Sequence, residues 1–164
     1  MMKSIRVLFL CALMIVGLGC LQSLDVEAKV KDDVEVEYFE DGSFMVTTLE
    51  DVDFDSGDEV TLLSTYKTVS KSKSATYYDA FGTAQWKFTI SGTFQYNGVT
   101  SFAKSASSSI VIYNSKWSVK SRNAYTSGNS VKGDIACTKK NLGIIPLTKS
   151  LSLTLTCSKD GVFS

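Results

Sequence analysis

Apolar and polar residues alternate along most of the chain after residue 28, with the two-residue period of strands that have one face in water. The alternation is clear at 34–38, 85–90 and 151–157. No segment after residue 28 keeps the 3.6-residue spacing of an amphipathic helix. The pattern therefore predicts an all-β protein.

Turn signals divide the alternating segments. Asp41-Gly42 and Asn97-Gly98 predict two-residue hairpin turns in which both central residues take a positive φ. The Ser/Lys stretch 70–74 is interpreted as a further turn, and Ser91-Gly92 as a bulge or bend. The resulting strands lie at 34–38, 44–48, 60–69, within 75–96, and at 99–103, 108–113, 117–122, 130–138 and 151–157. About nine strands at this spacing predict an antiparallel β-sandwich, immunoglobulin-like or related.

The first 28 residues have the pattern of a secretory signal peptide. Lys3 and Arg6 precede an apolar run at 7–21, and Ala28 follows Val26-Glu27 at a cleavage site that signal peptidase accepts. The run has 15 residues, whereas a membrane-spanning helix needs about 20. We expect a secreted protein; the alternative is a lipoprotein anchored through Cys20 after cleavage before that residue.

Cleavage after residue 28 leaves 136 residues, which we divide into an acidic segment with a β-hairpin at 29–59 and a β-sandwich domain at 60–164. The first part holds twelve acidic and two basic residues, and the second holds three acidic and thirteen basic residues. The zero net charge thus hides a strong separation of charge. The acidic part is expected to lie on the basic part, or the basic part to meet an anionic cell-wall polymer or lipid headgroups; the alternative is a solvated surface on both.

One region of the chain resembles a family of uncharacterised secreted domains of Gram-positive bacteria. The resemblance rests on 86–96, Trp117, 127–129 and 150–161, and it covers 60–164. These are turns and core positions. The resemblance implies an exported β domain and assigns no activity or functional residue.

Histidine is absent from the chain, which excludes Ser-His-Asp and Cys-His catalysis and imidazole zinc sites. Catalysis by two carboxylates needs no histidine, and Asp79 and Asp134 are the only acids within the strand-rich part. No motif surrounds either of them. We therefore expect a non-enzymatic protein without a cofactor.

Two cysteines, Cys137 and Cys157, remain after cleavage of the signal peptide. Cysteines of an exported protein tend to pair, which predicts a disulfide. A hairpin centred on residue 147 would place them opposite each other. A turn at 141–143 would shift the register so that they could meet only across the sandwich. Two buried free thiols are the alternative.

Acidic and apolar residues alternate at the start of the acidic loop predicted at 51–59, which precedes the strand predicted at 60–69. Asp51, Asp53 and Asp55 make a weak calcium candidate, because oxygen-rich loops can hold this ion. The EF-hand spacing fails, since Ser56 stands where glycine is needed and Leu62 where glutamate is needed. A solvated acidic turn is the preferred interpretation.

Aromatic and basic residues supply the remaining candidates for binding. Most aromatics on strands belong to a core, but Tyr77 and Tyr78 are adjacent, so one of them should face outward, and that one is the best single candidate for contact with a ligand. The aromatic set is Tyr77, Tyr78, Trp86, Phe88, Phe94, Tyr96, Tyr113, Trp117 and Tyr125. The basic set is Lys71, Lys73, Lys87, Lys104, Lys116, Lys120 and Arg122.

Export argues against nucleic acid as the target of these cations and favours an anionic wall polymer or a surface protein. The sequence thus predicts a non-enzymatic binding or surface-interaction module of the bacterial cell envelope. A structural β domain without a ligand is the second hypothesis, and a hydrolase that uses carboxylates alone is the third.

Overall fold

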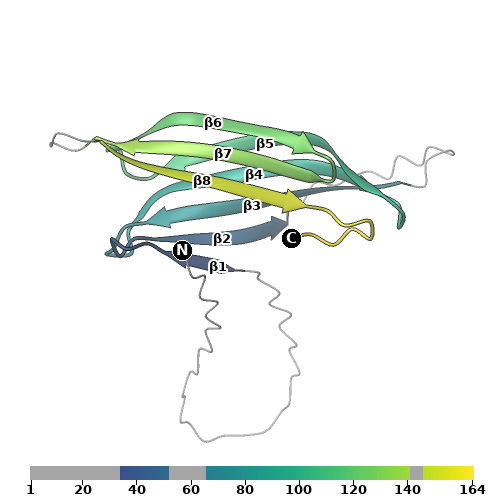
Figure 1. Ribbon diagram of the computed structural model, residues 1–164, viewed down its shortest axis with the longest axis horizontal. Coiled ribbons are helices and arrows are strands. Elements are labelled where there is room, and N and C mark those ends of the chain that lie inside the picture. The colour runs from purple at the N-terminus through teal and green to yellow at the C-terminus, as the bar shows by residue number, and fades with distance from the viewer. Residues whose placement is uncertain (1–33, 52–65, 141–145) are drawn as a thin grey trace, which may run out of the picture.

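The computed structural model describes residues 34–51, 66–140 and 146–164, which form eight strands in two antiparallel sheets (Figure 1). Sheet A has the order β1-β2-β3-β4-β5, and sheet B has the order β6-β7-β8. The strands are β1 (Glu35–Tyr38), β2 (Phe44–Asp51), β3 (Lys67–Tyr78), β4 (Ala84–Tyr96), β5 (Ser101–Ile112), β6 (Trp117–Ser127), β7 (Ser130–Lys139) and β8 (Leu147–Thr156). The predicted all-β sandwich class is confirmed, with eight described strands where about nine were expected.

The observed strands differ from the predicted ones in number and bounds at two stretches, 70–74 and 104–107. The predicted turn at 70–74 is wrong, because β3 runs through it and pairs with β2 and β4. Serine and lysine alternate there, so neither face carries the apolar residues that mark a strand. The predicted strands at 99–103 and 108–113 are one strand, β5. Residues 60–65 of the strand predicted at 60–69 lie outside the described residues.

The two strongest turn signals mark real hairpins with a different geometry from the one predicted. Phe39 N donates to Ser43 O at 2.8 Å around a three-residue loop, in which Gly42 supplies the positive φ of 77°. At the second hairpin Asn97 N donates to Thr100 O at 3.2 Å, so Gly98 is the first of two central residues. Its φ is 82°, and glycine at this position is typical of a type II′ turn.

The core lies between the sheets, where sheet B covers β3, β4 and β5 (Figure 1). The predicted alternation in β4 is confirmed, since Trp86, Phe88 and Ile90 are all buried. Two glycines let the sheets approach. A Cβ on Gly133 would collide with Ile90, and one on Gly92 would collide with Val131.

Bulges in the sheets fall at other places than Ser91-Gly92, where β4 stays in register. Between β4 and β5, Thr93 pairs with Ser105 and Phe94 with Ala103, so Lys104 is the extra residue. Between β6 and β7 the extra residue is Lys120, and between β3 and β4 it is Gln85. Bulges re-aim side chains: those of Lys104 and Lys120 are exposed, whereas that of Gln85 is buried.

The acidic hairpin is part of sheet A. All eight residues of β2 pair with β3, from Phe44 opposite Tyr78 to Asp51 opposite Lys71. β1 and β2 therefore form one edge of the sheet and β5 forms the other. Within residues 34–51, Asp41 and Glu50 form ion pairs with Lys149 and Lys87 of the basic part. The predicted signal peptide and the boundary at 59–60 lie outside the described residues.

Candidate functional site

Most of the candidate aromatic residues belong to the core. Tyr77, Trp86, Phe88, Phe94 and Trp117 are all buried. Tyr77 faces inward and its neighbour Tyr78 faces outward, as the alternation of β3 predicts. Tyr113 and Tyr125 are exposed, the first just after β5 and the second on β6.

The outward Tyr78 joins an aromatic row with Phe44 and Tyr38 across three neighbouring strands. The centroids of Phe44 and Tyr78 lie 4.9 Å apart with an interplanar angle of 8°, and those of Tyr38 and Phe44 lie 5.6 Å apart. The distance between the Phe44 and Tyr78 rings matches the spacing of adjacent strands, about 4.8 Å. The two rings therefore stack on each other and cover each other's faces. The row stabilises the β1–β2 hairpin and does not form a flat platform for stacking sugars.

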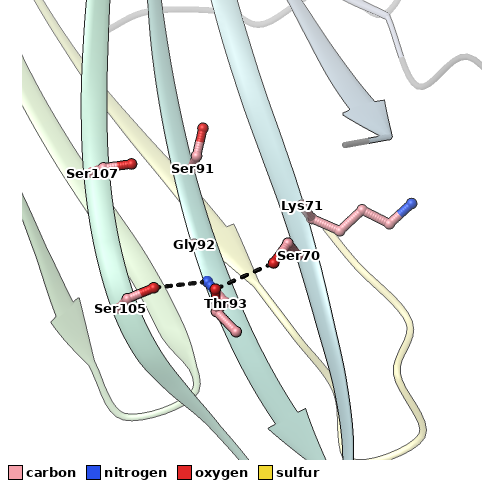
Figure 2. Close-up of a pocket in the computed structure, with 7 residues that line it drawn as sticks. All are labelled: Ser70, Lys71, Ser91, Gly92, Thr93, Ser105 and Ser107. Atoms are coloured by element: carbon pink, nitrogen blue, oxygen red, sulfur yellow. Dashed lines mark hydrogen bonds between the residues drawn. The ribbon is translucent and has the colours of Figure 1, made fainter. Parts of the chain in front are cut away.

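A shallow hollow of about 380 Å³ lies on the outer face of sheet A (Figure 2). Ser70 and Thr93 hydroxyls lie 3.2 Å apart, and Thr93 N donates to the Ser105 hydroxyl at 3.3 Å. The charged lining residue Lys71 extends away from these hydroxyls in Figure 2. Among the described residues no carboxylate lines the hollow, so they do not supply the paired groups that acid–base chemistry by carboxylates needs.

The two acids of the strand-rich part have separate structural roles. The Asp79 carboxylate caps the β3–β4 turn and accepts from Phe81 N and Thr83 N, both at 3.0 Å, and from Gln85 Nε2 at 2.9 Å. Asp134, in β7 of the other sheet, accepts from the Ser152 hydroxyl at 2.6 Å. The fold does not bring these carboxylates together as a catalytic pair.

The calcium candidate is only partly within the described residues. Asp51 ends β2, whereas Asp53 and Asp55 lie outside the described ranges. Within the described ranges no group of three or more His, Cys, Asp or Glu residues is close enough to hold a metal ion. Calcium binding by this loop stays a prediction.

The predicted disulfide is wrong, because Cys137 and Cys157 are free, buried thiols. Cys137 lies in β7 opposite Lys149 of β8, and Cys157 directly follows β8. Cys157 comes eight residues after Lys149, about 26 Å along an extended strand, and a disulfide needs Cα atoms within about 7 Å. The hairpin is thus centred near residue 143, which is the second of the two registers considered from the sequence. Burial raises the pKa of both thiols, that of Cys137 to about 11.

The candidate cations separate into two groups. Lys71, Lys73 and Lys87 lie on the central strands β3 and β4, and Lys87 Nζ forms a 2.7 Å ion pair with Glu50. This ion pair and the Ser74 hydroxyl, which donates to Glu50 at 2.7 Å, lower the pKa of Glu50. Lys87 is therefore part of the sheet's own side-chain network, and Lys71 Nζ lies 5.8 Å from the centroid of the Phe163 ring.

The second group forms the basic edge, which consists of Lys104, Lys116, Lys120 and Arg122. It follows β5, the β5–β6 turn and β6, two strands that lie side by side and share the bond from Ala103 N to Gly128 O at 2.9 Å. All four side chains are exposed, and within the described ranges none forms an ion pair. Two of them are bulge residues, and lysine bulges are a common device on edge strands.

The acidic edge, which consists of Glu35, Glu37 and Glu40, lies on β1 and its turn. These three side chains are exposed and have no ion pair in the described part of the chain. Figure 1 shows β1 and β6 on opposite sides of the molecule. The sequence signal for this arrangement is the absence of Asp and Glu from 80 to 133 and of Lys and Arg from 34 to 51. The position of the edges follows only from the strand order.

Comparison of the chain with protein-family models, with curated proteins and with solved structures gives no match. The resemblance to secreted Gram-positive domains therefore stays an expectation. In the described ranges, no helix is long and apolar enough to cross a membrane.

Proposed function

We propose that the protein is an exported, non-enzymatic binding module of the bacterial cell envelope that holds an anionic wall polymer along its basic edge. The observation that carries the proposal is four exposed cations on β5, the β5–β6 turn and β6 that have no carboxylate partner among the described residues. Unopposed charge of one sign produces a local field that attracts a polyanion. Arginine and lysine both bind phosphate groups, arginine with two parallel hydrogen bonds.

An extended polymer fits this surface better than a small ligand. The four cations follow the length of two strands of 12 and 11 residues, which spreads the positive charge along a line. A polymer with a phosphate at every repeat can contact several of them at once. The separate positions of Asp79 and Asp134 favour this proposal over a hydrolase that uses carboxylates.

The proposal is tested with immobilised polyglycerol phosphate as the probe and uncharged dextran as the matrix control. The variant K104Q/K116Q/K120Q/R122Q should bind the polymer about tenfold more weakly or worse, because each exposed ion pair contributes roughly 0.2–1 kcal/mol. Wild-type binding should also weaken steeply with salt, since exposed charges are screened beyond about 8 Å at physiological ionic strength.

The matched control removes the same number of positive charges from β3 and the turn after β8, in the variant K67Q/K71Q/K73Q/K159Q. It should bind within about twofold of the wild type, apart from the general loss of positive charge. If both variants lose binding to the polymer equally, the polymer is attracted by the overall positive charge and not by the basic edge. Binding that neither variant nor salt changes would refute the basic edge as the binding surface, and no binding at all would leave a structural β domain without this ligand.

A further inference from the structure

We infer that the basic edge has a second occupant, the acidic edge of another copy of this chain. In this arrangement Glu35, Glu37 and Glu40 of one molecule dock on the basic edge of the next. The inference rests on the basic edge assigned under the proposed function and adds a partner that the polymer must displace.

Charge complementarity selects the partner. The described acidic hairpin, residues 34–51, has no Lys or Arg, and residues 101–127 have no Asp or Glu. Two acidic edges repel each other, and so do two basic edges. Symmetric pairing through one type of edge is therefore disfavoured, and contact between unlike edges is favoured.

The two edges cannot neutralise each other within one molecule. β1 and β5 are the first and last strands of sheet A, with three strands between them. Four strand spacings of about 4.8 Å place them roughly 19 Å apart. The Debye length is about 8 Å at physiological ionic strength, so the acidic edge can meet a basic edge only on another molecule.

The acidic edge also offers surface for a neighbour to cover. β1 has a strand partner on one side only among the described strands. Val36 and Tyr38 on this strand are 39% and 70% exposed. A short, charged edge strand resists indiscriminate pairing. Val36 and Tyr38 point to the opposite face of β1 from Glu35 and Glu37, so a basic neighbour that neutralises the glutamates covers the apolar side chains as well when it docks at the open edge of the strand.

Contact between unlike edges leaves one free acidic and one free basic edge on every pair. Such head-to-tail contacts extend into an open chain unless the geometry closes a ring. Because the same basic edge would hold the anionic polymer, polymer binding and self-association are mutually exclusive at that edge. Added polymer should therefore dissociate the assembly into single protein molecules, which are then bound along the polymer.

Sedimentation velocity of the purified protein tests the inference without polymer. At an ionic strength of about 0.01 M, where the Debye length is about 30 Å, the weight-average sedimentation coefficient should rise with protein concentration. At about 1 M, where this length is about 3 Å, it should not. A wild-type protein that stays monomeric at low ionic strength would overturn the inference.

Charge reversal identifies the edges. The variant E35K/E37K and the variant K120E/R122E should each stay monomeric at low ionic strength, and their equimolar mixture should associate again. K67E/K159E, which changes the net charge as much as K120E/R122E does but lies away from β5 and β6, should associate like the wild type. Association of either edge variant alone, or no association in the mixture, would refute edge-to-edge docking.

Polymer binding separates this inference from the proposed function. If K120E/R122E no longer binds polyglycerol phosphate and the wild type never self-associates, the basic edge binds polymer and only the present inference fails. If the wild type self-associates but does not bind polymer, only the proposed function fails.

Discussion

The Trp117 indole donates a hydrogen bond from Nε1 to Gln85 Oε1 at 3.0 Å, joining sheet B to sheet A through a buried amide. Gln85 Oε1 also accepts from Asn114 Nδ2 at 2.9 Å. Gln85 Nε2 donates to Asp79 Oδ2 at 2.9 Å and to Thr83 O at 3.0 Å. One amide thus satisfies four groups, and its position as a bulge residue in β4 turns it toward them.

Replacing Gln85 should destabilise the protein strongly. Gln85→Leu keeps the side-chain size but leaves the buried Trp117 indole nitrogen without an acceptor, so we expect a loss of about 2–4 kcal/mol in the free energy of unfolding. Gln85→Glu keeps an acceptor for Trp117 but sets a carboxylate against Asp79. Its loss should shrink as the pH falls toward 4 and one carboxyl group is protonated.

Urea denaturation at several pH values measures both effects. Gln95→Leu is a suitable control, because Gln95 lies on the same strand with an exposed hydrogen bond to Thr68. It should cost less than about 0.5 kcal/mol. A Gln85→Leu variant as stable as the control would show that the amide does not hold the two sheets together.

The sequence predicts the strand faces better than the polar core. The alternation of Trp86, Phe88 and Ile90 and the opposite directions of Tyr77 and Tyr78 follow from the two-residue period alone. The burial of Gln85 does not, because its partner Trp117 is 32 residues away and a bulge interrupts the period. Bulges depend on the pairing of two strands, which a local pattern does not contain.

Register and strand order also lie beyond the local pattern. Placing the β7–β8 turn near residue 143 instead of 147 separates Cys137 from Cys157 and removes the predicted disulfide. The charge separation is visible in the sequence, but only the strand order puts β1 and β5 on opposite edges of sheet A. The basic edge is therefore a tertiary feature, although each of its four residues is evident in the sequence.

The two thiols should be inert in the folded protein. Cys137 and Cys157 are both fully buried, and burial raises the pKa of each thiol, which keeps the reactive thiolate scarce. Iodoacetamide at pH 8 should leave both unmodified in native protein and modify both in guanidinium chloride. Peptide mapping by mass spectrometry detects the difference.

An exposed cysteine provides the positive control for this measurement. Ser107 lies on the outer face of sheet A and is exposed, so Ser107→Cys should react with iodoacetamide in the native state. Rapid modification of Cys137 or Cys157 without denaturant, or a peptide that links them, would contradict the buried free thiols.

Asp41 should make part of the stability depend on pH in the acid range. Its carboxylate accepts hydrogen bonds from the backbone nitrogen of Ser43 at 3.1 Å and from the Ser43 hydroxyl, and it pairs with Lys149 Nζ at 3.0 Å. The Ser43 hydroxyl bond and then Lys149 lower the pKa of Asp41 to about 2 from its ordinary value of 3.8. This contact also ties the β1–β2 turn of sheet A to β8 of sheet B.

The lowered pKa of Asp41 determines in which direction its contribution to stability changes with pH. The folded state holds the charged carboxylate more favourably than the unfolded chain does, so the contribution is complete above pH 3.8 and is lost as the pH falls through about 2. Half of the Asp41 side chain is exposed, and solvent screening limits the contribution to about 0.5–1 kcal/mol.

Denaturation of Asp41→Asn and wild type between pH 7 and pH 2 tests this contribution. The variant should be less stable by that amount at pH 7, and the two stability curves should converge between pH 4 and pH 2. Glu40→Gln, which removes a neighbouring exposed carboxylate without an ion pair in the described ranges, should follow the wild-type curve. If Asp41→Asn keeps a constant deficit down to pH 2, its cost comes from altered turn geometry, because protonation of the native carboxylate would then change nothing.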